Sequence, residues 1–372
     1  MADWAVGTVR AIAVPKGLVG GPFGSLLGGK DYVPDGVPVI RGVNLASAGF
    51  FDESEFVYVT AAKAGGELAR NLARPGDVVF TQRGTLGQVG LVPAGPHDTY
   101  VISQSQMRLR VDPAKADPRF IYYQFRSAAM QAAIHSSAIT TGVPHINLGI
   151  LGGLPIVLPP LGEQGAIADL LTALDRKIAG NERLAAAAMR LAAAEYAAIG
   201  PAGPACPLSD LVDLVYGKAL PAARRRAGAV TVYGSGGPSG RHDTPLVRGP
   251  GIVVGRKGTV GSVHWSSGDF FPIDTTFYVR PVTVPLEYAY FLLRGLDLAG
   301  MNSDSAVPGL NRTRALAVEV RRPDPRAVAG FAERVRPLFA LRERTGREND
   351  ALRALRDDLL PRLLAGDLRL RG

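Results

Sequence analysis

Cysteine is almost absent from this sequence of 372 residues, in which Cys206 is the only one. A single cysteine excludes an internal disulfide and any metal site built from several cysteines. The five histidines do not have the spacing of metal ligands. No apolar run approaches the roughly 18 residues that a membrane-spanning helix needs, and residues 1–10 lack the apolar centre of a signal peptide. These absences predict a cytoplasmic protein that uses no metal and no cofactor.

Acidic residues are outnumbered, because 42 Lys and Arg face 33 Asp and Glu and give a net charge of +9. Only seven of the 42 basic residues are lysine, and the arginine fork suits phosphate and the guanine edge better than a lysine does. This composition favours a nucleic-acid partner. A genomic coding bias toward Arg, Ala and Gly would produce the same composition, so charge alone does not decide.

Four short patterns occur twice in the same order, about 170 residues apart. The pairs are residues 83–87 with 257–261, 118–126 with 285–294, 143–147 with 307–311, and Asn181, Leu184 and Leu191 with Asn349, Leu352 and Leu359. Chance produces one such match more easily than four in register. The sequence therefore predicts a duplicated chain with loop insertions.

Each copy begins with short strands and ends with a long helix. The predicted strands, rich in β-branched residues and bounded by turn residues, are 37–40, 77–80, 251–255 and 276–279. Residues 163–198 lack proline and space their apolar residues by three and four, and GPAGP at 200–204 ends that helix. The second helix is predicted over 326–364, where Pro337 should either kink the helix or lie near its first turn.

Two helices of this length each carry an apolar stripe that needs a partner, and the simplest partner is the other helix in an antiparallel coiled coil. The residues expected at this contact, or at docking of a protein partner, are Leu174, Ile178, Asn181, Asn349, Leu352 and Leu359. A buried asparagine in a coiled coil fixes the register at some loss of stability. The alternative is that both asparagines face solvent.

The helical regions carry motifs that resemble a known family. The central motif is LPPLGEQ at 158–164, followed by LDRKI at 174–178 and by Asn181; the C-terminal motif is LRDDLLPRLLAGDL at 355–368. Both resemble the conserved regions of type I restriction-modification DNA specificity subunits. Residues 21–25, 39–44 and 232–237 are similar to openings of the recognition domains in that family. Gly162 and Gly165 depart from the good helix formers expected there, which leaves the start of the first helix open.

The resemblance implies an α+β fold with two target-recognition domains, separated by two long helices and related by an internal pseudo-twofold repeat. The implied domains are 1–160 (first recognition domain), 161–198 (central helix), 199–207 (linker), 208–323 (second recognition domain) and 324–372 (C-terminal helix). It also implies a subunit without catalytic residues. Its partners would be double-stranded DNA, two adenine methyltransferase subunits and, in the full complex, ATP-driven restriction subunits.

Catalytic motifs are weak in this sequence. Residues 24–30 match G-x-x-x-x-G-K, but a phosphate-binding loop needs Ser or Thr next, and Asp31 follows. DRK at 175–177 lies on a predicted helix without a second carboxylate on a strand, so it does not indicate a nuclease. Two alternatives remain open, namely a DNA-modifying enzyme that acts alone and a coiled-coil scaffold that binds no DNA.

The paired loops at 83–87 and 257–261 are the main candidates for DNA contact, because glycines allow close approach and Arg, Lys and Thr can reach phosphates or base edges. The candidate DNA-binding residues are Lys30, Arg41, Asn44, Arg83, Thr85, Thr140, Thr141, His145, Asn147, Tyr233, Ser235, Arg241, Arg256, Lys257, Thr259, Asn302, Ser303, Asn311 and Arg312. The alternatives are plain hairpin turns and helix-capping loops. The aromatic residues Tyr122, Tyr123, Tyr288, Tyr290 and Phe291 are expected in the core.

The helix length sets an expectation for the target. A helix over residues 163–198 spans roughly 54 Å at about 1.5 Å per residue, which corresponds to roughly 16 base pairs of B-DNA at about 3.4 Å each. With about 3–5 base pairs read by each domain, an unread spacer of roughly 5–9 remains. Because the two domains differ in sequence, we expect an asymmetric, bipartite target.

Overall fold

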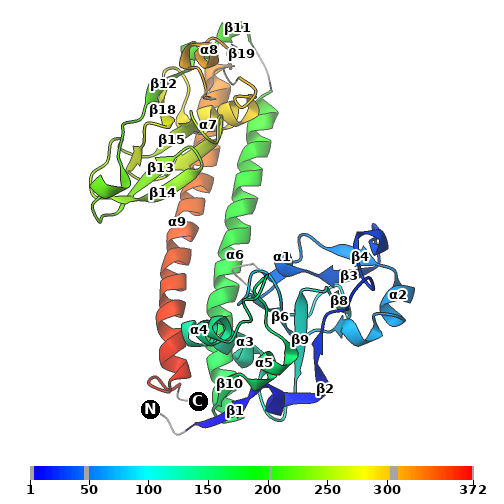
Figure 1. Cartoon of the computed structure of the whole chain (residues 1–372). Helices are drawn as coiled ribbons and strands as arrows, with labels where there is room; N and C mark the ends of the chain where they lie inside the picture. Colours follow the sequence, from blue (N-terminus) through cyan, green and yellow to red (C-terminus); the bar gives the residue numbers. More distant parts are fainter. Residues whose placement is uncertain (1–3, 46–49, 201–202, 302–308, 371–372) are drawn as a thin grey trace. The chain divides into compact units, whose positions relative to one another are not determined.

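The structure is a computed structural model that describes residues 4–45, 50–200, 203–301 and 309–370 (Figure 1). Its internal contacts divide the chain into unit 1, Met1–Gly180 with Asn349–Gly372, and unit 2, Asn181–Glu348. Two long helices, α6 (Leu161–Ile199) and α9 (Pro325–Leu364), contribute one part to each unit.

Unit 1 contains two four-stranded sheets. The first sheet is antiparallel, in the order β2 (Ala13–Gly20), β9 (Gln106–Val111), β6 (Val78–Thr81) and β7 (Val89–Leu91). The second sheet has the order β4 (Val57–Val59), β3 (Val37–Ile40), β8 (Tyr100–Ile102) and β5 (Leu72–Ala73), with β3 and β8 parallel. A further ribbon joins β1 (Ala5–Thr8) to β10 (Pro155–Leu158). The short α-helices are α1 (Gly42–Leu45), α2 (Ala61–Gly65), α3 (Pro118–Arg126), α4 (Ala128–Ser136) and α5 (Leu148–Gly153).

Unit 2 repeats this topology. Its antiparallel sheet has the order β12 (Val212–Tyr216), β18 (Thr276–Pro281), β15 (Gly251–Gly255) and β16 (Val263–Ser266). Its second sheet has the order β14 (Gly237–His242), β13 (Val230–Gly234) and β17 (Phe270–Pro272), with β13 and β17 parallel. The ribbon is β11 (Ala205–Pro207) with β19 (Glu319–Arg321), and the short α-helices are α7 (Leu286–Gly295) and α8 (Arg312–Leu316). The predicted α+β fold with an internal repeat is confirmed.

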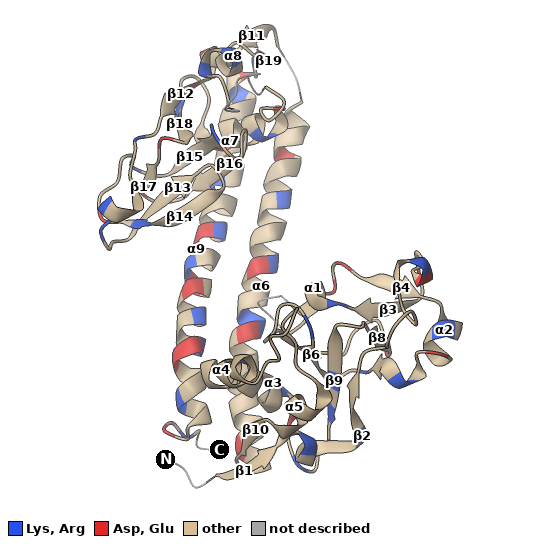
Figure 2. Ribbon diagram, in the orientation of Figure 1, with Lys and Arg blue, Asp and Glu red and all other residues tan. Residues whose placement is uncertain are grey.

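The long helices follow the sequence closely. α6 begins at Leu161, two residues before the expected start and directly after two prolines, whose fixed φ suits the extended chain before a helix. Gly200 ends it in the left-handed region, at φ +66°. Pro337 lies well inside α9 rather than near its first turn, and the helix continues through it with the proline ring exposed. Acidic and basic residues alternate along both helices, as on a solvated face (Figure 2).

Within each unit the segments of α6 and α9 run antiparallel. In unit 1, the Asn349 amide donates to the carbonyl of Ile178 at 3.1 Å, while Arg356 binds Asp175. In unit 2, the Asn181 amide donates to the Glu348 carboxylate at 2.9 Å. Both asparagines are only 4% exposed, so they do not face solvent as the alternative required. That they fix the register stays a prediction.

The predicted helix contacts are only partly buried. Ile178 is 4% exposed, whereas Leu174, Leu352 and Leu359 are half-buried. The fully buried contact between the two helices in unit 1 involves other leucines. Leu363 of α9 is fully buried and packs in one cluster with Leu171 of α6. In unit 1 the buried faces of α6 and α9 therefore pack against α3 and the first sheet as well as against each other.

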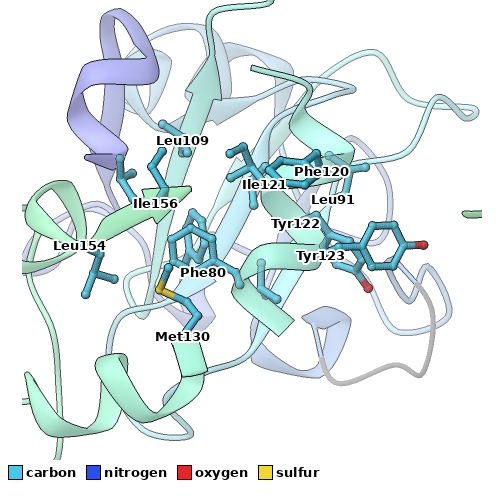
Figure 3. Close-up of a cluster of buried hydrophobic side chains, with 14 of the residues drawn as sticks. Phe80, Leu91, Leu109, Phe120, Ile121, Tyr122, Tyr123, Met130, Leu154 and Ile156 are labelled. Atoms are coloured by element: carbon cyan, nitrogen blue, oxygen red, sulfur yellow. The ribbon is translucent and has the colours of Figure 1, made fainter. Parts of the chain in front are cut away.

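Side chains of helix α3 pack beside those of the first sheet of unit 1 (Figure 3). The same cluster includes Leu171 of α6 and Leu363 of α9. Phe120, Tyr122 and Phe125 are fully buried and Tyr123 is 1% exposed, which confirms that these aromatic residues belong to the core. Burial raises the pKa of Tyr122 to about 12. The equivalent helix α7 places Tyr288, Tyr290 and Phe291 in the core of unit 2, each 5–7% exposed.

A buried ion pair ties three helices of unit 1 together. Asp175 on α6 is 4% exposed and accepts a hydrogen bond from Arg356 Nη1 of α9 at 2.7 Å and one from the Tyr123 hydroxyl of α3 at 2.9 Å. Arg126 Nη1 lies 3.7 Å from the same carboxylate. A buried carboxylate keeps its charge at an acceptable free energy only when it is paired in this way.

Removing Arg356 should therefore destabilise unit 1 more than a surface change does. We expect Arg356→Ala to lower the free energy of unfolding by about 3–5 kcal/mol, because it strands a buried charge. The double variant Asp175→Leu with Arg356→Met should recover most of this loss. Urea denaturation measures both. Equal stability of Arg356→Ala and the parent protein would contradict the buried pair.

The apolar contact is tested by leucines of the same helix. Leu363→Ala removes a fully buried side chain and should lower the free energy of unfolding by about 2–5 kcal/mol. Leu355 is 47% exposed, so Leu355→Ala, the matched control, should change it by about 0.5 kcal/mol or less. Similar midpoints for the two variants in thermal unfolding would show that α9 does not pack as described.

Candidate nucleic-acid interface

In unit 1 the glycine-rich turn at residues 83–87 follows strand β6. Gly84 and Gly87 have φ values of +97° and +87°, which residues other than glycine rarely adopt. The Leu86 amide donates to the Gly84 carbonyl at 2.9 Å, and the Leu86 side chain is buried in the core. The turn is therefore anchored by Leu86 and leaves Arg83 and Thr85 exposed.

A second loop of unit 1, residues 139–147, lies against this turn. The Ile146 amide donates to the Gln82 carbonyl at 2.9 Å, and the Gly84 amide donates to the Pro144 carbonyl at 3.2 Å. The loop carries Thr140 and Thr141, which are both exposed. We call Arg83, Thr85, Thr140 and Thr141 the first recognition surface.

Unit 2 builds the same arrangement from residues 255–261. Gly258 and Gly261 have φ values of +80° and +77°, and the Leu310 amide donates to the Arg256 carbonyl at 2.9 Å, as Ile146 does to Gln82. Lys257 and Thr259 are exposed. The Thr259 amide lies 3.4 Å from Ser235 Oγ, at the end of β13.

We call Lys257, Thr259 and Ser235 the second recognition surface. Asn302 and Ser303, which were also predicted to contact DNA, lie outside the described residues. The two surfaces share a backbone design and differ in their side chains. One offers a guanidinium and three threonine hydroxyls, and the other offers an ammonium and two hydroxyls.

Two of the predicted DNA contacts are engaged in the fold. Asn44 is fully buried; its Oδ1 accepts from the Arg41 amide at 2.8 Å and its Nδ2 donates to the Asp52 carbonyl at 2.9 Å. Tyr233 is 7% exposed and meets Phe270 edge to face, with ring centroids 5.9 Å apart. Both side chains are buried and engaged by the fold itself, and direct base contact by Asn44 and Tyr233 stays a prediction.

Asn147 and Asn311 cap helices, as the alternative interpretation held. Asn147 Oδ1 accepts from the Ile150 amide at 2.9 Å, and Asn311 Oδ1 accepts from the Arg314 amide at 3.0 Å. Both are exposed, so their amide nitrogens remain on the surface beside the loops. Capping explains why an asparagine stands at both places in the repeat.

Several predicted basic side chains are engaged by the protein itself. Arg312 donates to the Leu214 carbonyl and pairs with Asp213. Arg256 donates to the Asp274 carbonyl at 3.0 Å and lies over the Tyr216 ring at 5.0 Å. These arginines are half-buried and have less freedom to reach DNA than the exposed Arg83 and Lys257.

The same holds for part of the remaining set. Arg41 donates to the Glu55 carbonyl at 2.6 Å, Arg241 to the Ala229 carbonyl at 2.9 Å, and His145 Nδ1 lies 3.1 Å from the Val143 carbonyl oxygen. Arg241 is exposed, whereas Arg41 and His145 are half-buried. Direct base contact by these three stays a prediction.

Lys30 ends the G-x-x-x-x-G-K stretch and is exposed. Only a short 3-10 helix, Gly29–Asp31, follows the stretch, so no α-helix N-terminus is available to hold a phosphate. Asp31 pairs with Lys63 at 3.1 Å, and the hydrogen bond from Lys63 lowers the pKa of Asp31. This negative charge makes the loop a poor nucleotide site.

Gln131 on α4 was not predicted from the sequence, although it binds the turn that carries Arg83 and Thr85. Its Nε2 donates to the Gly87 carbonyl at 2.8 Å. The repeat gave no signal, because the position at the matching offset in unit 2 is Ala299.

In the described parts of the chain no group of three His, Cys, Asp or Glu residues could hold a metal ion, and no described helix is long and apolar enough to cross a membrane.

Comparison with known proteins gives a consistent result. Residues 52–188 match the family model of the type I restriction modification DNA specificity domain. The fold is similar to the crystal structure of the type I restriction-modification system S subunit from M. genitalium, with a TM-score of 0.68 and 19% identity over 97% of this chain and 96% of that one. The HsdS subunit from Thermoanaerobacter tengcongensis also matches, with a TM-score of 0.41 and 18% identity over 99% and 98% of the two chains. No curated protein sequence matches.

The matched family model is that of a DNA specificity domain and spans residues 52–188. At 19% identity the structural similarity establishes the fold, and the family model covers residues 52–180 of unit 1 together with α6 as far as residue 188. Together with the motifs on α6 and α9, these findings confirm the resemblance of this chain to the DNA specificity subunits of type I restriction-modification systems.

Proposed function

We propose that this chain gives a type I restriction-modification complex its DNA sequence specificity, with unit 1 reading one half of a split target and unit 2 the other. The observation that carries the proposal is the pair of recognition surfaces. The same glycine turn recurs in both units, and its exposed side chains are the types that reach phosphates and base edges.

The chemical difference between the surfaces supports an asymmetric target. The guanidinium of Arg83 can bind the O6 and N7 atoms of guanine with two parallel hydrogen bonds, whereas the ammonium of Lys257 is a single flexible charge. Thr85, Thr140 and Thr141 add hydroxyls and methyl groups in unit 1, where unit 2 offers Thr259 and Ser235. Two different sets of donors select two different half-sites.

The long helices supply the candidate docking surface for methyltransferase subunits. On the part of α6 that lies in unit 2, Leu184 and Leu191 are 47% and 52% exposed and are separated by two helical turns, which places them on one face. Exposed leucines repeated on a helix face favour a protein partner. We propose one methyltransferase subunit for each unit, with restriction subunits joining the full complex, and a spacer in the DNA whose length depends on the two helices.

The first experiment separates this proposal from its alternatives. We expect the purified chain alone to transfer no methyl group from S-adenosylmethionine, and the chain with its methyltransferase subunits to methylate adenines in one split, non-palindromic motif. Filter binding of duplex DNA in moderate salt and sequencing of the methylated DNA measure this. Methyl transfer by the chain alone would identify an independent enzyme, and a complex without sequence preference would identify a scaffold.

Exchange of one recognition region tests the division of labour. Replacing residues 208–320 by those of a relative should change one half-site and leave the other half-site and the spacer length unchanged, because the surface with Arg83 is untouched. The methylated motif of the hybrid complex gives the result. A simultaneous change of both half-sites would show that the units do not read separately.

A further inference from the structure

Besides Leu86, a second side chain, that of Gln131, binds the turn that carries Arg83 and Thr85. Gln131 Nε2 donates to the Gly87 carbonyl at 2.8 Å and to the Phe125 carbonyl at 2.7 Å. The glutamine therefore joins the last residue of the turn to the last turn of α3. Gln131 itself is half-buried, so it does not share the outer surface with Arg83 and Thr85.

The fit between Gln131 and Gly87 is close. A Cβ added to Gly87 would lie 2.0 Å from Gln131 Oε1, nearer than any real contact of that kind. Gly87 is required for its positive φ, and a side chain at this position would in addition displace the amide of Gln131. Two side chains therefore fix the position of the turn: Leu86, which is buried in the core, and Gln131, whose amide binds the Gly87 carbonyl.

Hydrogen bonds also fix helix α4, which carries Gln131, and helix α3, which precedes it in the chain. Ser127 Oγ accepts from the Met130 amide and caps α4, and Gln124 of α3 exchanges two hydrogen bonds with Val157 of β10, at 2.9 and 3.0 Å. Tyr123 of α3 binds the buried Asp175. The hydrogen-bonded chain from Asp175 through α3 to the turn is continuous within unit 1.

Unit 2 holds its equivalent turn differently. The position that corresponds to Gln131 is Ala299, and a Cβ added to Gly261 would lie 2.6 Å from the Ala299 amide nitrogen and 2.8 Å from the Leu298 carbonyl carbon. The turn is therefore seated directly against backbone. Its last glycine also donates to the Gly255 carbonyl at 2.9 Å.

We infer that Gln131 is a positioning residue for sequence readout, which fixes Arg83 and Thr85 against the first half-site without touching DNA. The inference rests on the proposed function. A guanidinium must be held within a narrow range of position and direction to form two parallel bonds with a guanine. When the hydrogen bonds of Gln131 are lost, Arg83 still attracts phosphates but no longer selects a base.

The test uses Gln131→Met, which keeps the length of the side chain and removes both donated bonds. In complex with the methyltransferase subunits, the preference for the correct base over others in the first half-site should fall about three- to tenfold, the worth of one or two neutral hydrogen bonds. The second half-site should keep its sequence, and binding to non-specific DNA should be unchanged. The measurement is methylation of a library randomised in both half-sites.

Matched variants separate positioning from a general structural effect. Ala132→Met places the same side chain at the exposed neighbouring position of α4 and should leave both half-sites intact, whereas Arg83→Ala should relax the same half-site as Gln131→Met. The melting temperature and co-purification with the methyltransferase should be those of the parent. If Gln131→Met does not fold, Gln131→Asn, whose amide is one methylene too short to reach, serves instead with the same expectation.

The outcomes are distinct. Relaxation confined to the half-site that Arg83→Ala also relaxes supports the positioning role. An unchanged first half-site, or equal relaxation of both half-sites, overturns it while the proposed function stands. A parent complex that methylates no defined motif overturns the proposed function itself.

Discussion

Unit 1 depends on the buried carboxylate of Asp175, because a charge inside a protein must be paired by groups that the fold brings to it. Arg356 comes from α9 and Tyr123 from α3, so the pair is complete only when three helices are in place. Unit 2 joins its helices with aromatic side chains instead: Tyr196 of α6 contacts Phe291 of α7 and Phe331 of α9, with ring centroids 5.6 and 6.1 Å apart. Unit 1 therefore adds a buried ion pair to its apolar helix contacts, whereas unit 2 adds an aromatic cluster and more exposed pairs such as Arg336 with Glu287.

The sequence predicted the architecture well because the signals of the fold are local and occur twice. A long stretch without proline, a glycine after it and short β-branched segments between turns define helices and strands with little help from distant residues. Pro337 lies in the interior of α9 and not near its first turn. A proline on the exposed side of a long, otherwise well-packed helix loses one hydrogen bond, and the packing of Phe331, Val335 and Phe339 on the other side holds the helix together.

The recognition residues were harder to predict, because exposure depends on which way a side chain points after the chain has folded. Arg41 and Asn44 share a motif, yet Asn44 turns inward to close the backbone around Asp52. Arg83 and Arg312 are both basic residues beside repeated loops, but Asp213 lies close enough to engage only Arg312. Residue type indicates the chemistry that is available, and only the contacts show which groups the fold already uses.

The glycine turns of the two units are supported by different groups, which affects how each turn can change. In unit 2 the turn rests on the backbone of residues 298 and 299, which no single side-chain substitution removes. In unit 1 it rests on the amide of Gln131, and one substitution there can alter the position of Arg83 while the core with Leu86 stays intact. A reading surface supported by a side chain can be shifted separately from the scaffold. If Gln131 positions Arg83 as proposed, substitutions can adjust the geometry of the first recognition surface in small steps, whereas the second changes mainly through the residues that it exposes.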